Sequence, residues 1–138
     1  MTLQLIASTY PSGSNAMDAE LVFNDRYLRI NVVGSVTPQA LLEVMDQYTA
    51  DERFNVALGV LWDMRQAKPD NSLRADGIQL AASHVPPTTR PRKVAFLVAS
   101  DLGYGLSRMA MVFGEDEQRQ HEIFRELEAA DTWLRAEG

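Results

Sequence analysis

The chain has 138 residues, of which 46% are hydrophobic, and its formal net charge is −6 at pH 7. A chain of this length suits one domain, which buries roughly 65–70% of the surface that the unfolded chain exposes. The hydrophobic content excludes a disordered protein, and the negative charge argues against a nucleic acid partner because phosphates repel it. Cysteine is absent, which excludes disulfides, a thiol nucleophile and zinc sites with cysteine ligands.

The sequence contains no run of about 18 apolar residues, so we expect no transmembrane segment. The N-terminus lacks the basic start and the apolar core of a signal peptide. We therefore expect a cytoplasmic protein.

Residues 19–138 are expected to form the domain, with residues 1–18 as an N-terminal extension. Within the extension, residues 3–9 form a weakly indicated strand. Residues 11–15 are a loop by composition, because proline, glycine, serine and asparagine favour turns.

Residues 21–23 and 27–32 are typical of two antiparallel strands joined by a polar turn. In the second strand apolar residues alternate with Arg29 and Asn31, so one face is more polar than the other. We expect this pair at an edge of the sheet, ending at Gly34.

Thr37 and Pro38 indicate a helix start, since the hydroxyl caps the helix and proline needs no hydrogen-bond partner at the first position. This helix extends to about residue 50. A buried strand over residues 58–62 follows and ends at Asp63, and the next segment, 65–71, is predicted to be a loop.

Ser72 is expected to cap a helix that Pro86 and Pro87 terminate. Residues 94–99 are an unbroken apolar run, which predicts a strand that is buried on both faces in the middle of a sheet. Ser100 and Asp101 then offer caps for a helix. Its apolar face is predicted to consist of Leu102, Leu106, Met109, Ala110 and Phe113.

The C-terminal segment allows two interpretations. Residues 115–135 fit one charged helix, which the periodicity slightly favours. Alternatively, residues 121–124 form a short edge strand and residues 125–135 form the final helix. In both cases strands alternate with helices, which predicts an α/β fold with a mixed, mostly parallel sheet of about five strands.

Several segments of the chain resemble the SpoIIAA-like group of small STAS-related proteins. They are YLRINVVGSVTPQALLEVM, LGVLWDMR, KVAFLVASDLGYGLSRM and FRELEAADTWL, which together extend from about residue 21 to 134. The resemblance implies a five-stranded mixed sheet and favours the strand at 121–124. It also implies a protein-interaction or regulatory module, of a shape similar to the CRAL-TRIO lipid-binding fold.

Some STAS domains are regulated by phosphorylation of a serine in an Asp-Ser-Ser-Gly run. The comparable segment here, residues 70–73, reads Asp-Asn-Ser-Leu, so only Ser72 matches. Ser72 is therefore the candidate phosphorylation site that the resemblance implies, although the second serine and the glycine are missing.

A ligand site is predicted at the edge of the sheet where the buried strands end. Glycines in the first turn of a helix expose N–H groups, and the helix dipole favours an anion there. Ligands of open α/β sheets bind at this carboxyl edge. The predicted ligand-binding residues are Asp63, Ser72, Asp101, Gly103, Tyr104 and Gly105. The alternative is structural: the glycines allow close packing, and the two aspartates organise loops.

Other groups give weaker signals. His84 and His121 have no metal-ligand spacing, and no Gly-x-Ser-x-Gly motif of a hydrolase is present. Arg90, Arg92 and Lys93 form a basic cluster that could contact an anion, or simply a solvated loop. Trp62, Tyr104, Trp133 and the methionines at 109 and 111 could line an apolar pocket, but residues at this spacing are more often in the core. Tyr104 is the one expected to be exposed.

The sequence therefore predicts a non-enzymatic STAS-like interaction or regulatory module, without cofactor or metal, that binds a protein partner and could form a homodimer. The alternative is a protein that binds a lipid, nucleotide or other small anion at the carboxyl edge of the sheet. A hydrolase built on Asp63 and a loop serine is a third and weaker hypothesis.

Overall fold

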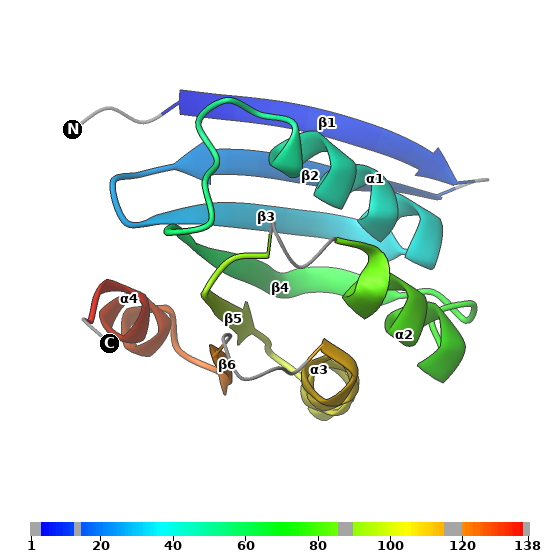
Figure 1. Cartoon of the computed structure of the whole chain (residues 1–138). Helices are drawn as coiled ribbons and strands as arrows, with labels where there is room; N and C mark the ends of the chain where they lie inside the picture. Colours follow the sequence, from blue (N-terminus) through cyan, green and yellow to red (C-terminus); the bar gives the residue numbers. More distant parts are fainter. Residues whose placement is uncertain (1–3, 13–14, 86–89, 115–119, 137–138) are drawn as a thin grey trace.

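The computed structural model describes residues 4–12, 15–85, 90–114 and 120–136. Strands and helices alternate along most of this chain (Figure 1). In chain order the elements are β1 (Gln4–Ser12), β2 (Asn15–Phe23), β3 (Tyr27–Val36), α1 (Pro38–Thr49), β4 (Gly59–Pro69), α2 (Ala75–His84), β5 (Lys93–Leu97), α3 (Asp101–Gly114), β6 (Gln120–Phe124) and α4 (Leu127–Arg135).

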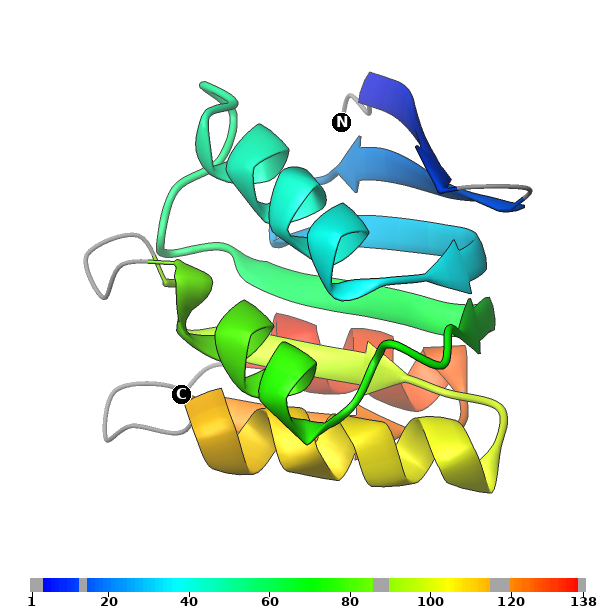
Figure 2. The ribbon, with the colours of Figure 1, turned by 90° about the vertical axis from the view of Figure 1, so that its right-hand side faces the viewer.

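The described strands form one sheet of six strands, in which the spatial order equals the chain order from β1 to β6. The pairs β1–β2 and β2–β3 are antiparallel, and the three remaining pairs are parallel. Helices α1, α2 and α3 cover one face of the sheet, and α4 packs on the other face (Figures 1 and 2). The predicted α/β class with a mixed sheet is confirmed.

The N-terminal part of the sheet is larger than the sequence pattern indicated. The predicted loop over residues 11–15 is wrong for residues 11, 12 and 15, because β1 continues to Ser12 and β2 begins at Asn15, and residues 13–14 lie outside the described residues. The expected domain start at residue 19 falls inside β2, whose pairing with β3 begins at Met17 opposite Gly34.

The antiparallel pair of β2 and β3 is confirmed, but its place at the sheet edge is wrong. Because β1 pairs with the outer side of β2, both strands lie in the interior of the sheet. Strand β3 also continues past Gly34 to Val36. Gly34 has a φ of 101°, a conformation that glycine adopts without the strain of a side chain.

The prediction for α1 is confirmed: Thr37 caps the helix by accepting a hydrogen bond from the backbone N–H of Ala40. Strand β4, however, does not end at Asp63. It continues through the segment predicted to be a loop as far as Pro69, because β3 remains its partner up to the pair Val36 and Pro69.

Ser72 does not cap the following helix. Helix α2 begins at Ala75 after Arg74, which makes no side-chain capping bond. Ser72 lies in the preceding turn instead. The helix ends at His84, and the two prolines predicted to terminate it lie outside the described residues.

The strand predicted at 94–99 is confirmed as β5, although it ends at Leu97, two residues earlier than predicted; it pairs with β4 on one side and β6 on the other. Ser100 caps α3, since its Oγ accepts a hydrogen bond from the N–H of Gly103 at 3.0 Å. The predicted apolar face of α3 is partly wrong, because Leu102 is 61% exposed. The side chain of Phe113 lies outside the described residues.

At the C-terminal end, the structure contains strand β6 and the separate helix α4. The interpretation that the family resemblance favoured is confirmed, and the single long helix is wrong. Pairing with β5 explains this outcome, because the backbone N–H and C=O groups of residues 120–124 bond to the neighbouring strand.

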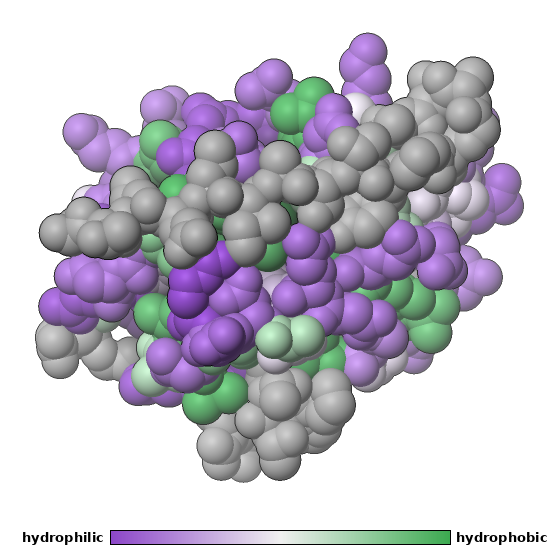
Figure 3. Space-filling view, turned by 90° about the horizontal axis from the view of Figure 1, so that it is seen from above, coloured by the Kyte–Doolittle hydropathy of each residue, from purple (hydrophilic) through white to green (hydrophobic). Residues whose placement is uncertain are grey.

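The buried side chains form two clusters, one on each face of the sheet. The larger cluster includes Ile30, Val44 and Trp62 beneath α1, and the smaller one includes Leu61, Leu97 and other residues beneath α4. Seen from above, the described surface is mainly hydrophilic, with hydrophobic residues in small separate groups (Figure 3).

Candidate functional site

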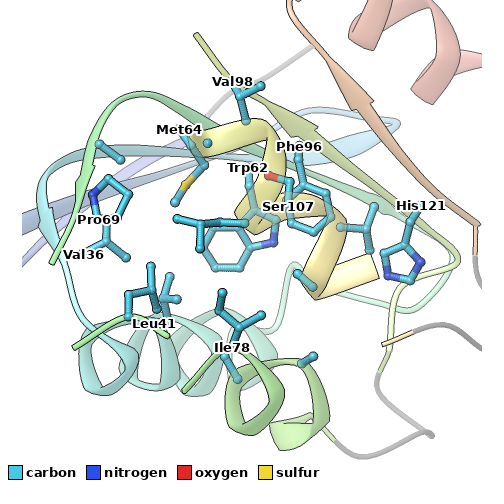
Figure 4. A pocket seen from close by; sticks show the side chains of 18 of the residues that line it. Val36, Leu41, Trp62, Met64, Pro69, Ile78, Phe96, Val98, Ser107 and His121 are labelled. Atoms are coloured by element: carbon cyan, nitrogen blue, oxygen red, sulfur yellow. The ribbon is translucent and has the colours of Figure 1, made fainter. Parts of the chain in front are cut away.

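A cavity of about 250 Å³ lies between the sheet and the three helices α1, α2 and α3 (Figure 4). Its wall is largely apolar, with Trp62 and Phe96 from the sheet, Leu41 from α1 and Ile78 from α2. The cavity is partly open to solvent, so a ligand could enter it. Small-molecule sites in proteins are typically concave and mostly apolar, which makes this cavity the strongest candidate for a binding site.

The inner face of α3 explains why the space remains open. The residues that this helix directs to the cavity are mostly small and include Gly103, Ser107 and Ala110. Gly103 packs closely, because a Cβ atom there would lie 3.3 Å from Cβ of Val98. Small side chains at these positions leave a gap between α3 and the sheet that larger ones would fill.

The cavity has two distinct ends. Val36 and Pro69 lie at one end and His121 at the other (Figure 4). Arg90 also lines the cavity, and its Nε donates a hydrogen bond to the carbonyl of Val85 at 2.7 Å. The His121 ring stacks on Phe96, with 6.3 Å between the ring centroids and 11° between the planes.

The predicted ligand-binding residues do not converge in this cavity. Of the six, only Gly103 lines it. Neighbouring side chains of a strand point to opposite faces, so Asp63 lies on the α4 face of the sheet while Trp62 faces the cavity. The sequence could not reveal this separation, because it required knowing that β4 continues past Asp63.

Asp63 is the acceptor for two arginines. Its carboxylate accepts a hydrogen bond from Arg29 at 2.9 Å and two from the side chain of Arg65, at 2.9 and 2.8 Å. Burial opposes ionisation of Asp63, but the hydrogen bonds from Arg65 and Arg29 outweigh it, so its pKa is lowered. A carboxylate held in this way is a structural anchor and a poor general base.

Ser72 and Asp70 form a local turn. The Ser72 hydroxyl donates to Oδ2 of Asp70 at 2.5 Å, and the Ser72 N–H donates to the same oxygen at 2.9 Å. The side-chain hydrogen bond from Ser72 lowers the pKa of Asp70. Ser72 is exposed and does not line the cavity.

The remaining predicted residues lie on the exposed side of α3. Asp101 forms an ion pair with Arg125 at 3.0 Å, and the Arg125 guanidinium also lies over the Tyr104 ring at 5.5 Å. Tyr104 is 37% exposed, so its predicted exposure is confirmed. Gly105 has no atom within 4 Å of an added Cβ, and thus no packing role.

The two histidines and the basic cluster are also dispersed. His84 pairs with Asp46 of α1 at 2.7 Å. Nζ of Lys93 donates to the carbonyls of Trp133 and Ala136 at 2.8 Å each, so Lys93 stabilises the end of α4. Trp133 lies on the α4 face, whereas Trp62 lies at the cavity.

In the described part of the chain, no group of three or more histidine, aspartate or glutamate residues is placed to hold a metal ion. Within the same residues, none of the helices combines the length and the apolar character needed to cross a bilayer.

Sequence reasoning missed His121, Arg90 and Ser107 as cavity residues. His121 was expected in or beside the short strand that the family resemblance favoured, but the sequence did not show which face of the sheet its side chain would occupy. Ser107 carried a usable signal: a polar residue on the inner face of an amphipathic helix requires a polar or hollow environment.

This arrangement of strands and helices is a SpoIIAA-like α/β fold, and the resemblance inferred from the sequence is confirmed at the level of the fold. One similar solved structure is an uncharacterised protein of the DUF3478 family from Shewanella loihica. It has 16% sequence identity and a TM-score of 0.53, and the match covers 97% of this chain and 96% of that chain.

A second similar structure is an anti-sigma factor antagonist from Mycobacterium paratuberculosis. It has 13% identity and a TM-score of 0.50, and the match covers 96% of each chain. No family model matches the sequence. The search of curated proteins likewise gave no match. What these comparisons establish is a shared fold.

Proposed function

We propose that this chain is a non-enzymatic, cytoplasmic protein-interaction module with a regulatory role. One protein with a similar fold is an anti-sigma factor antagonist, which supports this class of function. The observation that carries the proposal is a set of exposed apolar side chains on α3. We define the α3 surface as Leu102, Tyr104 and Val112.

The α3 surface is unusual for its exposure. Leu102 is 61% and Val112 is 67% exposed, although both are large hydrophobic residues. Single exposed hydrophobic residues are ordinary. Three of the six large hydrophobic residues that are exposed in the described part of the chain lie on α3, which is why we propose this helix as the contact surface. Tyr104 and its neighbour Arg125 strengthen the proposal, because tyrosine and arginine are enriched in protein interfaces.

The candidate catalytic groups support a non-enzymatic role. Asp63 is neutralised by two arginines, and His84 pairs with Asp46 and does not line the cavity that His121 lines. A nucleophile, a base and an orienting group within hydrogen-bond reach are what hydrolysis by a triad requires. These side chains do not form such an arrangement.

The test is partner capture with matched variants. Crosslinking and mass spectrometry on the tagged chain should identify a defined partner, with sedimentation to detect a second copy of the chain in that role. Leu102→Glu should weaken capture at least about tenfold, as for a central interface residue. Val56→Glu is the control, because Val56 is 42% exposed but lies in the loop before β4. Equal capture by the two variants would contradict the proposal.

Ser72 is retained as a proposed phosphorylation site on the strength of its exposure. A phosphate there would lie beside Asp70, which now accepts the Ser72 hydroxyl, and the two negative charges would repel each other. Phosphorylation would thereby open the turn before α2. If Ser72→Asp and Ser72→Ala both capture the partner as the parent does, regulation through Ser72 is excluded.

Small-molecule binding is the second candidate function, and the cavity is the observation that favours it. Its location differs from the predicted one, since the cavity extends beneath the helices rather than over Asp63, Ser72 and Tyr104. A thermal-shift screen tests this candidate. A ligand at about one hundred times its Kd stabilises a protein by about 2.7 kcal/mol, which raises Tm by several degrees.

A further inference from the structure

We propose that the cavity binds an uncharged, mainly apolar molecule through an oxygen atom that forms hydrogen bonds with Trp62 and Ser107. This inference rests on the second candidate function, small-molecule binding, and names the class of ligand. It follows from two buried polar groups that lack a partner among the described residues, and from the apolar wall around them.

Trp62 of β4 and Ser107 of α3 both point into the cavity (Figure 4). Trp62 is 6% exposed and Ser107 is 7% exposed. Neither the indole N–H nor the hydroxyl forms a hydrogen bond to any residue that the structure describes. Buried tryptophan and serine side chains normally have such a partner, so these two groups require an explanation.

A bound molecule can reach both groups. Among the described residues that are not exposed, the side-chain nitrogen or oxygen that is sealed off and lacks a partner is Nη1 of Arg53. The indole nitrogen of Trp62 and the hydroxyl oxygen of Ser107 are therefore accessible from the cavity that they line. The indole can only donate, whereas the hydroxyl can donate or accept. The oxygen of a ketone, ester, amide or alcohol can satisfy both.

The wall of the cavity favours a ligand without charge. It is largely apolar, and no aspartate or glutamate lines it within the described residues. The Arg65 guanidinium is held by Asp63. Arg90 donates to the carbonyl of Val85. A charged ligand would lose its hydration here without gaining an uncommitted counter-charge, which is costly.

A ring of six atoms is a suitable probe of the site. An apolar cavity of 150 Å³ accommodates benzene, so a cavity of about 250 Å³ has room for such a ring. Because the cavity is partly open to solvent, the natural ligand can be larger and extend out of it. Cyclohexanone and methylenecyclohexane are a matched pair, since they differ only in the replacement of the carbonyl oxygen by a CH₂ group.

The NMR signal of the Trp62 indole N–H tests the hydrogen bond directly. The chain has two tryptophans, so Trp133→Phe leaves Trp62 as the source of the indole signal. We expect this signal to move downfield and to saturate as cyclohexanone is added, and not to move downfield with methylenecyclohexane. Cyclohexanecarboxylate and cyclohexylammonium should not bind at concentrations at which cyclohexanone saturates the site.

Ser107→Ala tests the second hydrogen bond. It should weaken binding of cyclohexanone about fivefold and leave binding of methylenecyclohexane unchanged, because only the ketone loses a hydrogen bond. Without ligand its Tm should not fall, since the hydroxyl has no partner to lose. Ser83→Ala is the matched control, because Ser83 is exposed on α2 and its hydroxyl donates to the carbonyl of Gln79.

A substitution that fills the cavity tests the location. Ala110→Leu should abolish binding of both probes, since it introduces three carbons from α3. Arg108→Leu is the matched control, because it places the same side chain on the exposed side of that helix. Ala82→Leu fills the cavity from α2 and replaces Ala110→Leu if that variant does not fold.

The outcomes separate this inference from the candidate function beneath it. If cyclohexanone leaves the Trp62 signal unchanged while the thermal-shift screen yields ligands, water alone satisfies the two groups, and only the inference is wrong. Equal weakening of both probes by Ser107→Ala, or a Tm lowered by several degrees, overturns the role of the hydroxyl. Equal binding of cyclohexanecarboxylate or cyclohexylammonium overturns the uncharged class. Binding that Ala110→Leu, or Ala82→Leu in its place, does not reduce overturns the location.

If neither probe changes the Trp62 signal and no compound in the thermal-shift screen raises Tm, both the inference and small-molecule binding are wrong.

Discussion

The two faces of the sheet are held together in different ways. Beneath α1, α2 and α3 the contacts are almost entirely apolar and a cavity of about 250 Å³ remains. Beneath and beside α4 the apolar cluster is smaller, and polar links supplement it. Tyr27 donates to Asp131 at 2.5 Å, Lys93 donates to carbonyls at the end of α4, and Asp63 joins β3 to β4 through Arg29.

The difference shows that this small protein has directional hydrogen bonds on the α4 face and unfilled space on the α1–α3 face. Apolar contacts have no direction, so the α1–α3 face tolerates incomplete filling at a modest cost. Hydrogen bonds have a preferred geometry, so a small number of them is enough to fix the position of α4. Burial, followed by the hydrogen bond to Asp131, raises the pKa of Tyr27 to about 12.

Truncation of core residues should have the largest effect and should differ between the faces. Leu61→Ala removes a fully buried side chain from the α4 face and should cost about 3–4 kcal/mol. Ile78→Ala enlarges an existing cavity, where the side chain has fewer neighbours to lose, and should cost about 2 kcal/mol. Urea denaturation measures both. Equal costs would mean that the two faces are equally well packed.

Enlargement of core residues should show the opposite asymmetry. Ala130→Leu introduces three carbons into a site with 0% exposure on the α4 face and should cost about 2–3 kcal/mol. Ala110→Leu fills the cavity and should leave stability unchanged or raise it by about 0.5 kcal/mol. Differential scanning calorimetry compares the two variants. Destabilisation by Ala110→Leu to the same extent would contradict an open cavity.

Loss of Asp63 should affect stability and its dependence on pH. Asp63→Ala leaves Arg29 and Arg65 without their shared partner, which should cost about 2 kcal/mol at pH 7; both arginines are partly exposed, so water screens them. The pKa of Asp63 is lowered in the folded protein. Its contribution to stability is therefore complete when the pH is above the pKa of Asp63 in the unfolded chain, and it declines as the pH falls through the pKa in the folded protein.

The parent should therefore lose more stability than Asp63→Ala when acidified from about pH 5 downward. Part of the acid sensitivity should remain in the variant, because Asp51 and Asp131 also have lowered pKa values. Urea titrations of the two proteins at several pH values measure this difference. Parallel pH profiles would show that Asp63 does not stabilise the fold through its charge.

Removal of the Lys93 ammonium should destabilise the protein less than the loss of Asp63. Lys93→Met keeps most of the aliphatic chain but removes the two hydrogen bonds to the carbonyls of Trp133 and Ala136, at a cost of about 1–2 kcal/mol. The loss should be confined to α4. Hydrogen exchange should therefore accelerate in α4 and remain unchanged in α1, and uniform acceleration would contradict a local role.

The sequence predicted the elements whose signals are local. The cap at Thr37, the continuous apolar run of β5 and the alternation in β3 depend on neighbouring residues, and the structure contains all three. The strand at Gln120–Phe124 was different. Its own pattern favoured a helix, and it became predictable only through the resemblance to SpoIIAA-like proteins.

The candidate site was much less predictable, because it depends on which face each side chain occupies. The sequence predicted that Asp63, Ser72 and Tyr104 lie at one edge of the sheet. In the structure Asp63 lies on the α4 face, Ser72 lies in a turn, and Tyr104 lies on the exposed side of α3. The extension of β4 from Asp63 to Pro69 was not predicted, and it keeps the Asp63 side chain on a face of the sheet rather than at the end of a strand.

The amino-acid sequence by itself determined the class of fold, since the spacing of apolar residues decides which segments become buried strands and amphipathic helices. Only the tertiary structure decided where internal space remains and which charges meet. A cavity depends on how the side chains of α1, α2, α3 and the sheet fit together, and residues such as Arg29 and Asp63 become partners only when β3 and β4 pair.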